Sequence, residues 1–419
     1  MRVAIGHSSA GAPFVRVWAA QGVSMVGDQV TALALPLIAV LVLHSGAAAV
    51  GLLSASRIVP FLVGSLLIGV YVDRMRRRPL LITADMVRGG LLVVLVALAG
   101  AGWLSLAWLI ALVIVVGGLT VLSDIATQSY LVDILAADRL VAANTRLQVT
   151  QAVARIGGPA AAGLLIGAFG SVLALLVDAL SFAISGLLII SIKLAERPRV
   201  RSRANAWMGI REGLALTYRQ PVLRALAVTA GYSNIVEQGL MVLLTVRFVG
   251  EQGHSAAQLG VALAIGAAGT VLGGLAINRL SRRWPAGRLL LCGEIVAALG
   301  LAGTAVVTAQ TQPLTVALVV ALCVFGVGEG VGNVLYAAIR QQIVPAQLQG
   351  RAYGSYRFVV SGTTPIGPLL AGAAASVLGT GAALLVLAAT AVGIPVWLFA
   401  AQVRRFGSAD APIPDRSDS

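Results

Sequence analysis

Long apolar segments alternate with short polar ones along this whole chain. About twelve of them run for roughly 20 residues or more, the length at which an α-helix crosses a bilayer. We place them at residues 14–43, 47–72, 79–101, 106–132, 142–168, 171–193, 222–249, 256–278, 287–309, 313–338, 350–378 and 380–403. The pattern predicts an all-α membrane protein of about twelve transmembrane helices.

Composition and charge agree with a membrane protein. The chain has 419 residues, of which 58% are hydrophobic and 11% charged, whereas a soluble domain has about 25% charged residues. The formal net charge is +14. Most arginines fall in alternate loops and in the C-terminal tail, while Arg57 and Arg247 fall on the other side. Because short basic loops stay in the cytoplasm, both termini are expected on the cytoplasmic side of the plasma (inner) membrane. This distribution of arginines does not indicate nucleic-acid binding.

The chain divides near residues 194–221, the longest internal loop. We expect a six-helix bundle over 1–193, a second one over 222–405, and a cytoplasmic tail over 406–419. Inside the loop, apolar residues recur at helical spacing, at Trp207, Ile210, Leu214 and Tyr218. They predict an amphipathic helix on the inner membrane surface, with a disordered basic linker as the alternative.

Two motifs recur between the halves. Gly69-x-x-x-Asp73-Arg74 is repeated as Gly274-x-x-x-Asn278-Arg279, 205 residues later. Gly158-Pro159 followed by Gly163 is repeated 209 residues later as Gly367-Pro368 followed by Gly372. A parallel repeat of two six-helix halves is a transporter architecture, with the site near the membrane midplane.

The hairpin over residues 69–78 resembles the signature hairpin of the major facilitator superfamily, although the family has a glycine near Arg76. The stretches 21–28, 84–88 and 211–224 resemble its macrolide-efflux and enterobactin-exporter-like members. The resemblance implies that Asp73 meets the start of the eleventh helix and latches the inner side shut. The arginines of the hairpin would then pair with acids or with anionic lipid; these are Arg74, Arg77 and Arg78.

The alternative is a basic loop that only sets topology. The second-half copy would latch more weakly, because Asn278 lacks the charge of Asp73. On the fifth helix, Gly158, Pro159 and Gly163 resemble the superfamily's exporter motif, and their alternative role is tight helix packing.

Ionisable residues at membrane depth are costly and therefore mark candidate functional sites. The resemblance implies that the first, fourth, seventh and tenth helices line the cavity, and these carry Asp28, Asp124, Glu237 and Glu329. We expect at least one of them, Asp28 or Glu237 first, to carry a coupling proton, with Arg155 as the cationic partner. A fixed ion pair or helix-end contact is the alternative for each acid. Asp85 and Arg88 are expected near the membrane interface, where they would support the hairpin, with Glu294 in a comparable place.

Cavity candidates for a substrate are Tyr232, Asn234, Phe325 and Tyr336. No nucleotide-binding loop, nucleophile elbow or metal motif occurs, so neither an enzyme nor a cofactor nor a metal is expected. We interpret the chain as a proton-coupled exporter of small apolar or cationic compounds that works as a monomer among membrane lipids. An importer or uniporter of a small metabolite is the alternative, and a non-transporting sensor a third possibility.

Overall fold

The computed structural model describes residues 11–60, 75–192, 218–310, 315–344 and 349–400. These residues are almost all helical, and none of them forms a strand. In lipid the backbone has no water to bond to, and a helix satisfies its N–H and C=O groups internally. The N-terminal helices are α1 Gly11–Leu41, α2 Ala47–Ser56, α4 Arg77–Gly100, α5 Leu106–Ile134 and α6 Ala137–Ile190.

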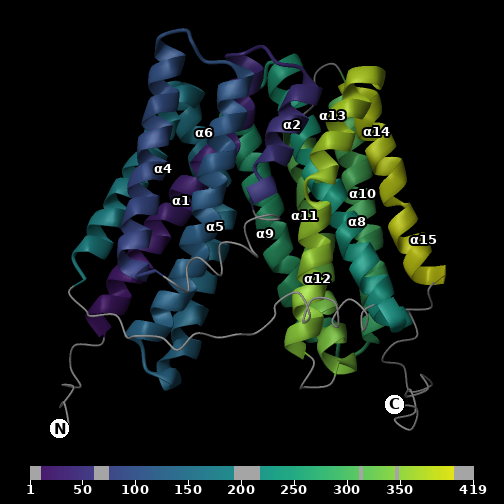
Figure 1. Cartoon of the computed structure of the whole chain (residues 1–419). Helices are drawn as coiled ribbons and strands as arrows, with labels where there is room; N and C mark the ends of the chain where they lie inside the picture. The colour runs from purple at the N-terminus through teal and green to yellow at the C-terminus, as the bar shows by residue number, and fades with distance from the viewer. Residues whose placement is uncertain (1–10, 61–74, 193–217, 311–314, 345–348, 401–419) are drawn as a thin grey trace. The chain divides into compact units, whose positions relative to one another are not determined.

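The C-terminal helices follow the same succession of long rods (Figure 1). They are α8 Pro221–Leu244, the π-helix η1 Thr245–Glu251, α9 Ala256–Leu280, α10 Ala286–Ala309, α11 Thr315–Ile343, α12 Gln349–Thr363, α13 Ile366–Leu378, α14 Thr380–Ala391 and α15 Gly393–Ala400. Local chemistry sets several starts. Ser105 caps α5 by accepting a hydrogen bond from the Trp108 N–H, and Pro221 opens α8.

Nine helices in the described residues are long and apolar enough to cross a membrane. One of them, Ala142–Ile190, covers two of the predicted segments. The short helix α2 lies in another, and α8, which is not among the nine, overlaps the predicted segment 222–249. The prediction of an all-α, multi-pass membrane protein is therefore confirmed.

The double-length helix α6 is two helices joined at one residue. Gly170 has φ 81° and ψ 159°, inside a run that is otherwise helical. Gly379 joins α13 to α14 with nearly the same angles, φ 83° and ψ 156°. Only glycine adopts this region readily, so each junction requires it.

These matched glycines belong to a repeat of constant register. Helix α10 begins and ends 209 residues after α4, and α11 begins and ends 209 residues after α5. Gly379 follows Gly170 by the same 209 residues, as does the Gly-Pro motif. A position in the first half therefore has a defined counterpart in the second.

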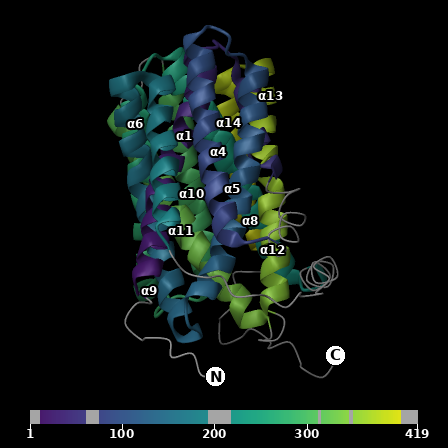
Figure 2. The ribbon, with the colours of Figure 1, turned by 60° about the vertical axis from the view of Figure 1, so that its left-hand side comes forward.

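Contacts divide the chain into two compact units, residues 1–204 with 248–264 and residues 205–247 with 265–419. In the first unit α6 packs along α1 and α4, and α4 along α5 (Figures 1 and 2). In the second unit α10 packs on α11 and α14, and α8 on α12 and α13. The predicted bundle limits of 1–193 and 222–405 stay a prediction, and most of the predicted loop lies outside the described residues.

Candidate functional site

The first unit holds an ion pair in its interior. Asp85 and Arg88 of α4 have exposed fractions of 0% and 2%, and the Arg88 guanidinium donates from Nη2 to the Asp85 carboxylate. Ser185 of α6 donates to Asp85 at 2.6 Å. An unpaired charge inside a helix bundle is energetically costly. Asp85 and Arg88 can therefore be buried because each charge compensates the other.

The same guanidinium is anchored to two more helices. It donates to Ser123 at 3.2 Å and to Thr120 at 3.3 Å, both on α5. Its carbon lies 4.1 Å from the centre of the Phe182 ring on α6, a cation–π contact. We call Asp85, Arg88, Thr120, Ser123, Phe182 and Ser185 the Arg88 cluster. It ties α4, α5 and α6 together and is electrically neutral.

A second acid lies buried between α1 and α6. Asp178 accepts hydrogen bonds from Thr31 and, at 2.9 Å, from Ser181. Gly27 packs directly against this acid, and a Cβ there would collide with the Asp178 and Ser181 side chains. Asp28, the next residue, is half-buried, and Arg88 is the basic group that interacts with it most strongly.

The second unit has its own buried acid, Glu294 of α10. The Tyr336 hydroxyl on α11 donates to its Oε1 at 2.6 Å, and Ser233 on α8 donates to its Oε2 in a long contact of 3.5 Å. Glu294 has an exposed fraction of 3%. Two helices from different parts of the second unit thus hold one carboxylate.

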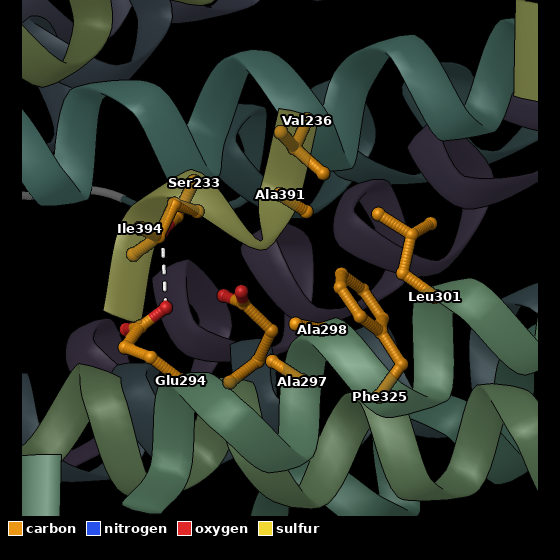
Figure 3. A pocket seen from close by; sticks show the side chains of 10 residues that line it. Ser233, Val236, Glu294, Ala297, Ala298, Leu301, Phe325, Ala391 and Ile394 are labelled. Carbon is orange, nitrogen blue, oxygen red and sulfur yellow. Dashed lines mark hydrogen bonds between the residues drawn. The ribbon is translucent and has the colours of Figure 1, made fainter. Parts of the chain in front are cut away.

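A small pocket opens beside Glu294 (Figure 3). It has room for about one water molecule, far less than a drug-sized ligand needs. Its lining is apolar except for one hydroxyl and two carboxylates; the residues are Ser233, Val236, Glu294, Ala297, Ala298, Leu301, Phe325, Glu329, Ala391 and Ile394. In Figure 3 Glu294 points toward Ser233, and Phe325 and Leu301 lie at the other end.

The five residues predicted to take part in proton coupling differ from one another in their exposure. Asp28, Glu237 and Glu329 are half-buried, on α1, α8 and α11. Asp124 and Arg155 are exposed, on α5 and α6. The charged side chains that interact with Asp28 include Arg88, Arg57 and Asp85, and not Arg155. The coupling role of all five stays a prediction.

The hairpin is only partly described, since Gly69, Asp73 and Arg74 lie outside the described residues. Arg77, at the start of α4, is buried and forms an ion pair with Asp133 of α5 at 4.0 Å. Arg78 donates to the Ile190 carbonyl at the end of α6 at 2.6 Å. These two arginines therefore hold the start of α4 against α5 and α6.

In the second-half copy Gly274 is half-buried, while Asn278 and Arg279 are exposed near the end of α9. A gating role for either hairpin stays a prediction.

The fifth-helix motif lies where helices approach closely. Gly158 packs on the Gln29 side chain of α1. Gly163 meets the backbone of Ala256 and Gly260, at the start of α9, which belongs to the first unit. The Pro159 carbonyl fills the space beside Gly260, so a Cβ at either glycine would force the helices apart.

The cavity candidates gather around the second unit's core. Phe325 lines the pocket, and Tyr336 bonds to Glu294. Tyr232 is half-buried against the apolar cluster that contains Tyr336. Asn234 is half-buried, and its Oδ1 atom has no hydrogen-bond partner among the described residues.

Asp85 and Arg88 lie about 12–16 Å from the start of α4 and are buried inside the bundle. Their expected place near the membrane interface stays a prediction. Glu294, which is also buried, follows Asp85 by the same 209 residues that separate the Gly-Pro motifs.

The chain is similar to known transporters along almost its whole length. The model of the Major Facilitator Superfamily matches residues 17–362 and 226–414. The multidrug efflux pump Tap of Mycobacterium tuberculosis is 31% identical over 399 residues, which cover 91% of each chain. The multidrug efflux pump Tap of Mycolicibacterium fortuitum is 27% identical over 378 residues, 86% of this chain and 88% of that one.

Solved structures share the fold at low identity. The nucleoside transporter NupG superposes with a TM-score of 0.76 at 12% identity, covering 93% of this chain and 99% of that one. A bacterial homologue of the lysosomal transporter Spinster, in an inward-facing and unoccupied conformation, superposes with a TM-score of 0.73 at 15% identity, covering 98% and 100%. At this level of identity, the two similarities show a shared fold and give no information about a substrate.

Proposed function

The chain belongs to the major facilitator superfamily, and on that premise we propose that it exports small apolar or cationic compounds by alternating access, driven by protons. The observation that carries the direction is the similarity to Tap, a multidrug efflux pump, across 91% of both chains. The apolar pocket lining and the acids on α1, α8, α10 and α11 support apolar or cationic cargo.

A pump-deficient bacterial host tests export. Cells that express the chain should accumulate less of some members of a compound panel, and an uncoupler should restore accumulation. Uncoupler-insensitive efflux would contradict proton coupling. Higher accumulation of a compound in expressing cells would indicate import instead.

We propose Asp28 or Glu237 as the proton carrier. They occupy matched positions, 209 residues apart, and both are half-buried at mid-length of their helices. A carrier must alternate between a charged and a neutral form, and a carboxylate in a helix bundle can do so.

Asp28→Asn and Glu237→Gln should abolish uphill export while leaving downhill flux or binding measurable. Protein abundance measured in parallel separates lost coupling from lost folding. Normal uphill export in both variants would remove these acids as carriers and direct attention to Asp124 and Glu329.

We further propose that both termini and the 194–221 loop face the cytoplasm, and that a single chain forms the transporter. The arginine distribution supports this orientation. A cysteine at position 44 or 254 should react with a membrane-impermeant maleimide in intact cells, whereas one at 201 or at the exposed position 76, next to Arg77, should not. Reaction at 201 would reverse the topology.

A further inference from the structure

The pocket beside Glu294 occupies the second-half counterpart of the Arg88 cluster. Glu294 follows Asp85 by 209 residues, and Ala297 follows Arg88 by the same number. Of the six cluster positions, five have counterparts that line the pocket: Glu294, Ala297, Glu329, Ala391 and Ile394. The two sites are therefore the same place in the repeat, filled in one half and open in the other.

The substitutions between the two sites explain the opening. Alanine at 297 replaces the arginine, and alanine at 391 replaces the Phe182 ring on which the guanidinium lies. Where Thr120 accepts from Arg88 in the first half, the second half has the carboxylate of Glu329. The second half has thus lost the cation and gained an acid.

Nothing basic in the described lining of the pocket compensates for this change. The charged groups that interact most strongly with Glu329 are Glu237 and Glu294, both acidic. Each Glu294 oxygen has one hydrogen-bond donor and can accept another. The Tyr336 hydroxyl supplies the donor to Glu294 that Arg88 supplies to Asp85, but it brings no positive charge.

We propose that this pocket binds the primary ammonium group of an exported substrate, which takes the place of the missing arginine. An ammonium group is about the size of a water molecule and so fits the space present. Glu294 and Glu329 would accept its hydrogen bonds, and the Phe325 ring would contact the carbon next to it. This inference rests on the proposed function and names the chemistry that the transporter selects.

Two matched probes test the pocket: 1-naphthylmethylamine, which is an ammonium ion at neutral pH, and the neutral 1-naphthylmethanol. Binding to the purified full chain in nanodiscs is measured by equilibrium dialysis, with empty nanodiscs subtracted. We expect the chain to prefer the amine by about tenfold or more.

Ala297→Arg should remove that preference, because it tethers a guanidinium in the pocket as Arg88 does in the first half. Glu251→Gln, which neutralises an exposed acid outside the pocket, should keep the preference. Glu329→Gln should lower it. An undiminished amine preference in Ala297→Arg would overturn the proposal.

If Ala297→Arg protein cannot be recovered folded, Glu329→Gln decides: a retained preference overturns the proposal, and a lost one supports it. Uphill transport by the unmodified chain in proteoliposomes distinguishes failure of the ammonium site from failure of the proposed export function. Export of panel compounds without any amine preference refutes only the ammonium site. Absence of uphill export refutes the proposed function, while amine binding would still stand.

Discussion

Replacing Arg88 with methionine should destabilise the first unit more than almost any other single change. The substitution keeps the stem of the side chain and removes the guanidinium. Asp85 then keeps only the hydrogen bond from Ser185 while remaining fully buried. Removing one partner of a buried ion pair costs about 3–5 kcal/mol.

The hydrogen bonds of Arg88 to Thr120 and Ser123 account for a smaller share. Such bonds average about 0.6 kcal/mol in membrane proteins, so the two together contribute about 1 kcal/mol. The stranded carboxylate therefore dominates the expected loss. We expect a total of about 3–5 kcal/mol for Arg88→Met, and a similar value for Asp85→Asn, which strands the guanidinium.

A double-mutant cycle measures the coupling. The free energy of unfolding is obtained by titrating the purified chain with sodium dodecyl sulfate in mixed micelles. Asp85→Asn with Arg88→Met should cost less than the sum of the single variants, by about 2 kcal/mol. Arg155→Met, at an exposed position on α6, should stay within about 0.5 kcal/mol of the unmodified chain. Additivity of the two cluster variants within about 0.5 kcal/mol would refute the buried-pair reasoning.

Two further predictions concern the hairpin and the helix junction. Asp73→Asn should impair transport of a panel compound while the protein still inserts, since a carboxylate at a helix N-terminus contributes about 0.3–1 kcal/mol, and Asn278→Ala should do less. Normal transport by Asp73→Asn would leave the hairpin a topological signal. Gly170→Ala should lower the free energy of unfolding by about 1–3 kcal/mol through its positive φ alone, because a Cβ there meets nothing within 4 Å. Gly157→Ala, equally open but helical, is the control, and equal losses in both would contradict a conformational cause.

The fold was predictable because it follows from the lengths of the apolar segments along the chain. Apolar segments of membrane length predict helices without knowledge of tertiary packing, and the junction at Gly170 falls between the predicted segments 142–168 and 171–193. The predicted bounds differ from the helices where a helix continues past the apolar segment into polar residues. Helix α6 begins at Ala137 rather than 142, and α11 ends at Ile343 rather than 338.

Which side chains face inward was harder to predict. A helix that is apolar on all sides gives no periodicity to mark its buried face. Asp124 was selected because the fourth helix is expected to line the cavity, and Arg155 as a nearby cation; both are exposed, and their coupling role stays a prediction. Arg88 was assigned to an interface, because sequence alone does not show that Asp85, Ser123 and Phe182 converge to accept it.

The single-residue joints at Gly170 and Gly379 have a mechanical consequence. A loop of several residues lets two neighbouring helices slide independently, whereas one residue offers only two rotatable bonds. One residue also keeps the two helix ends within a few ångströms of each other, so neither helix can slide along its axis without its neighbour. Each half therefore contains one pair of helices whose adjoining ends stay together in any movement of that half.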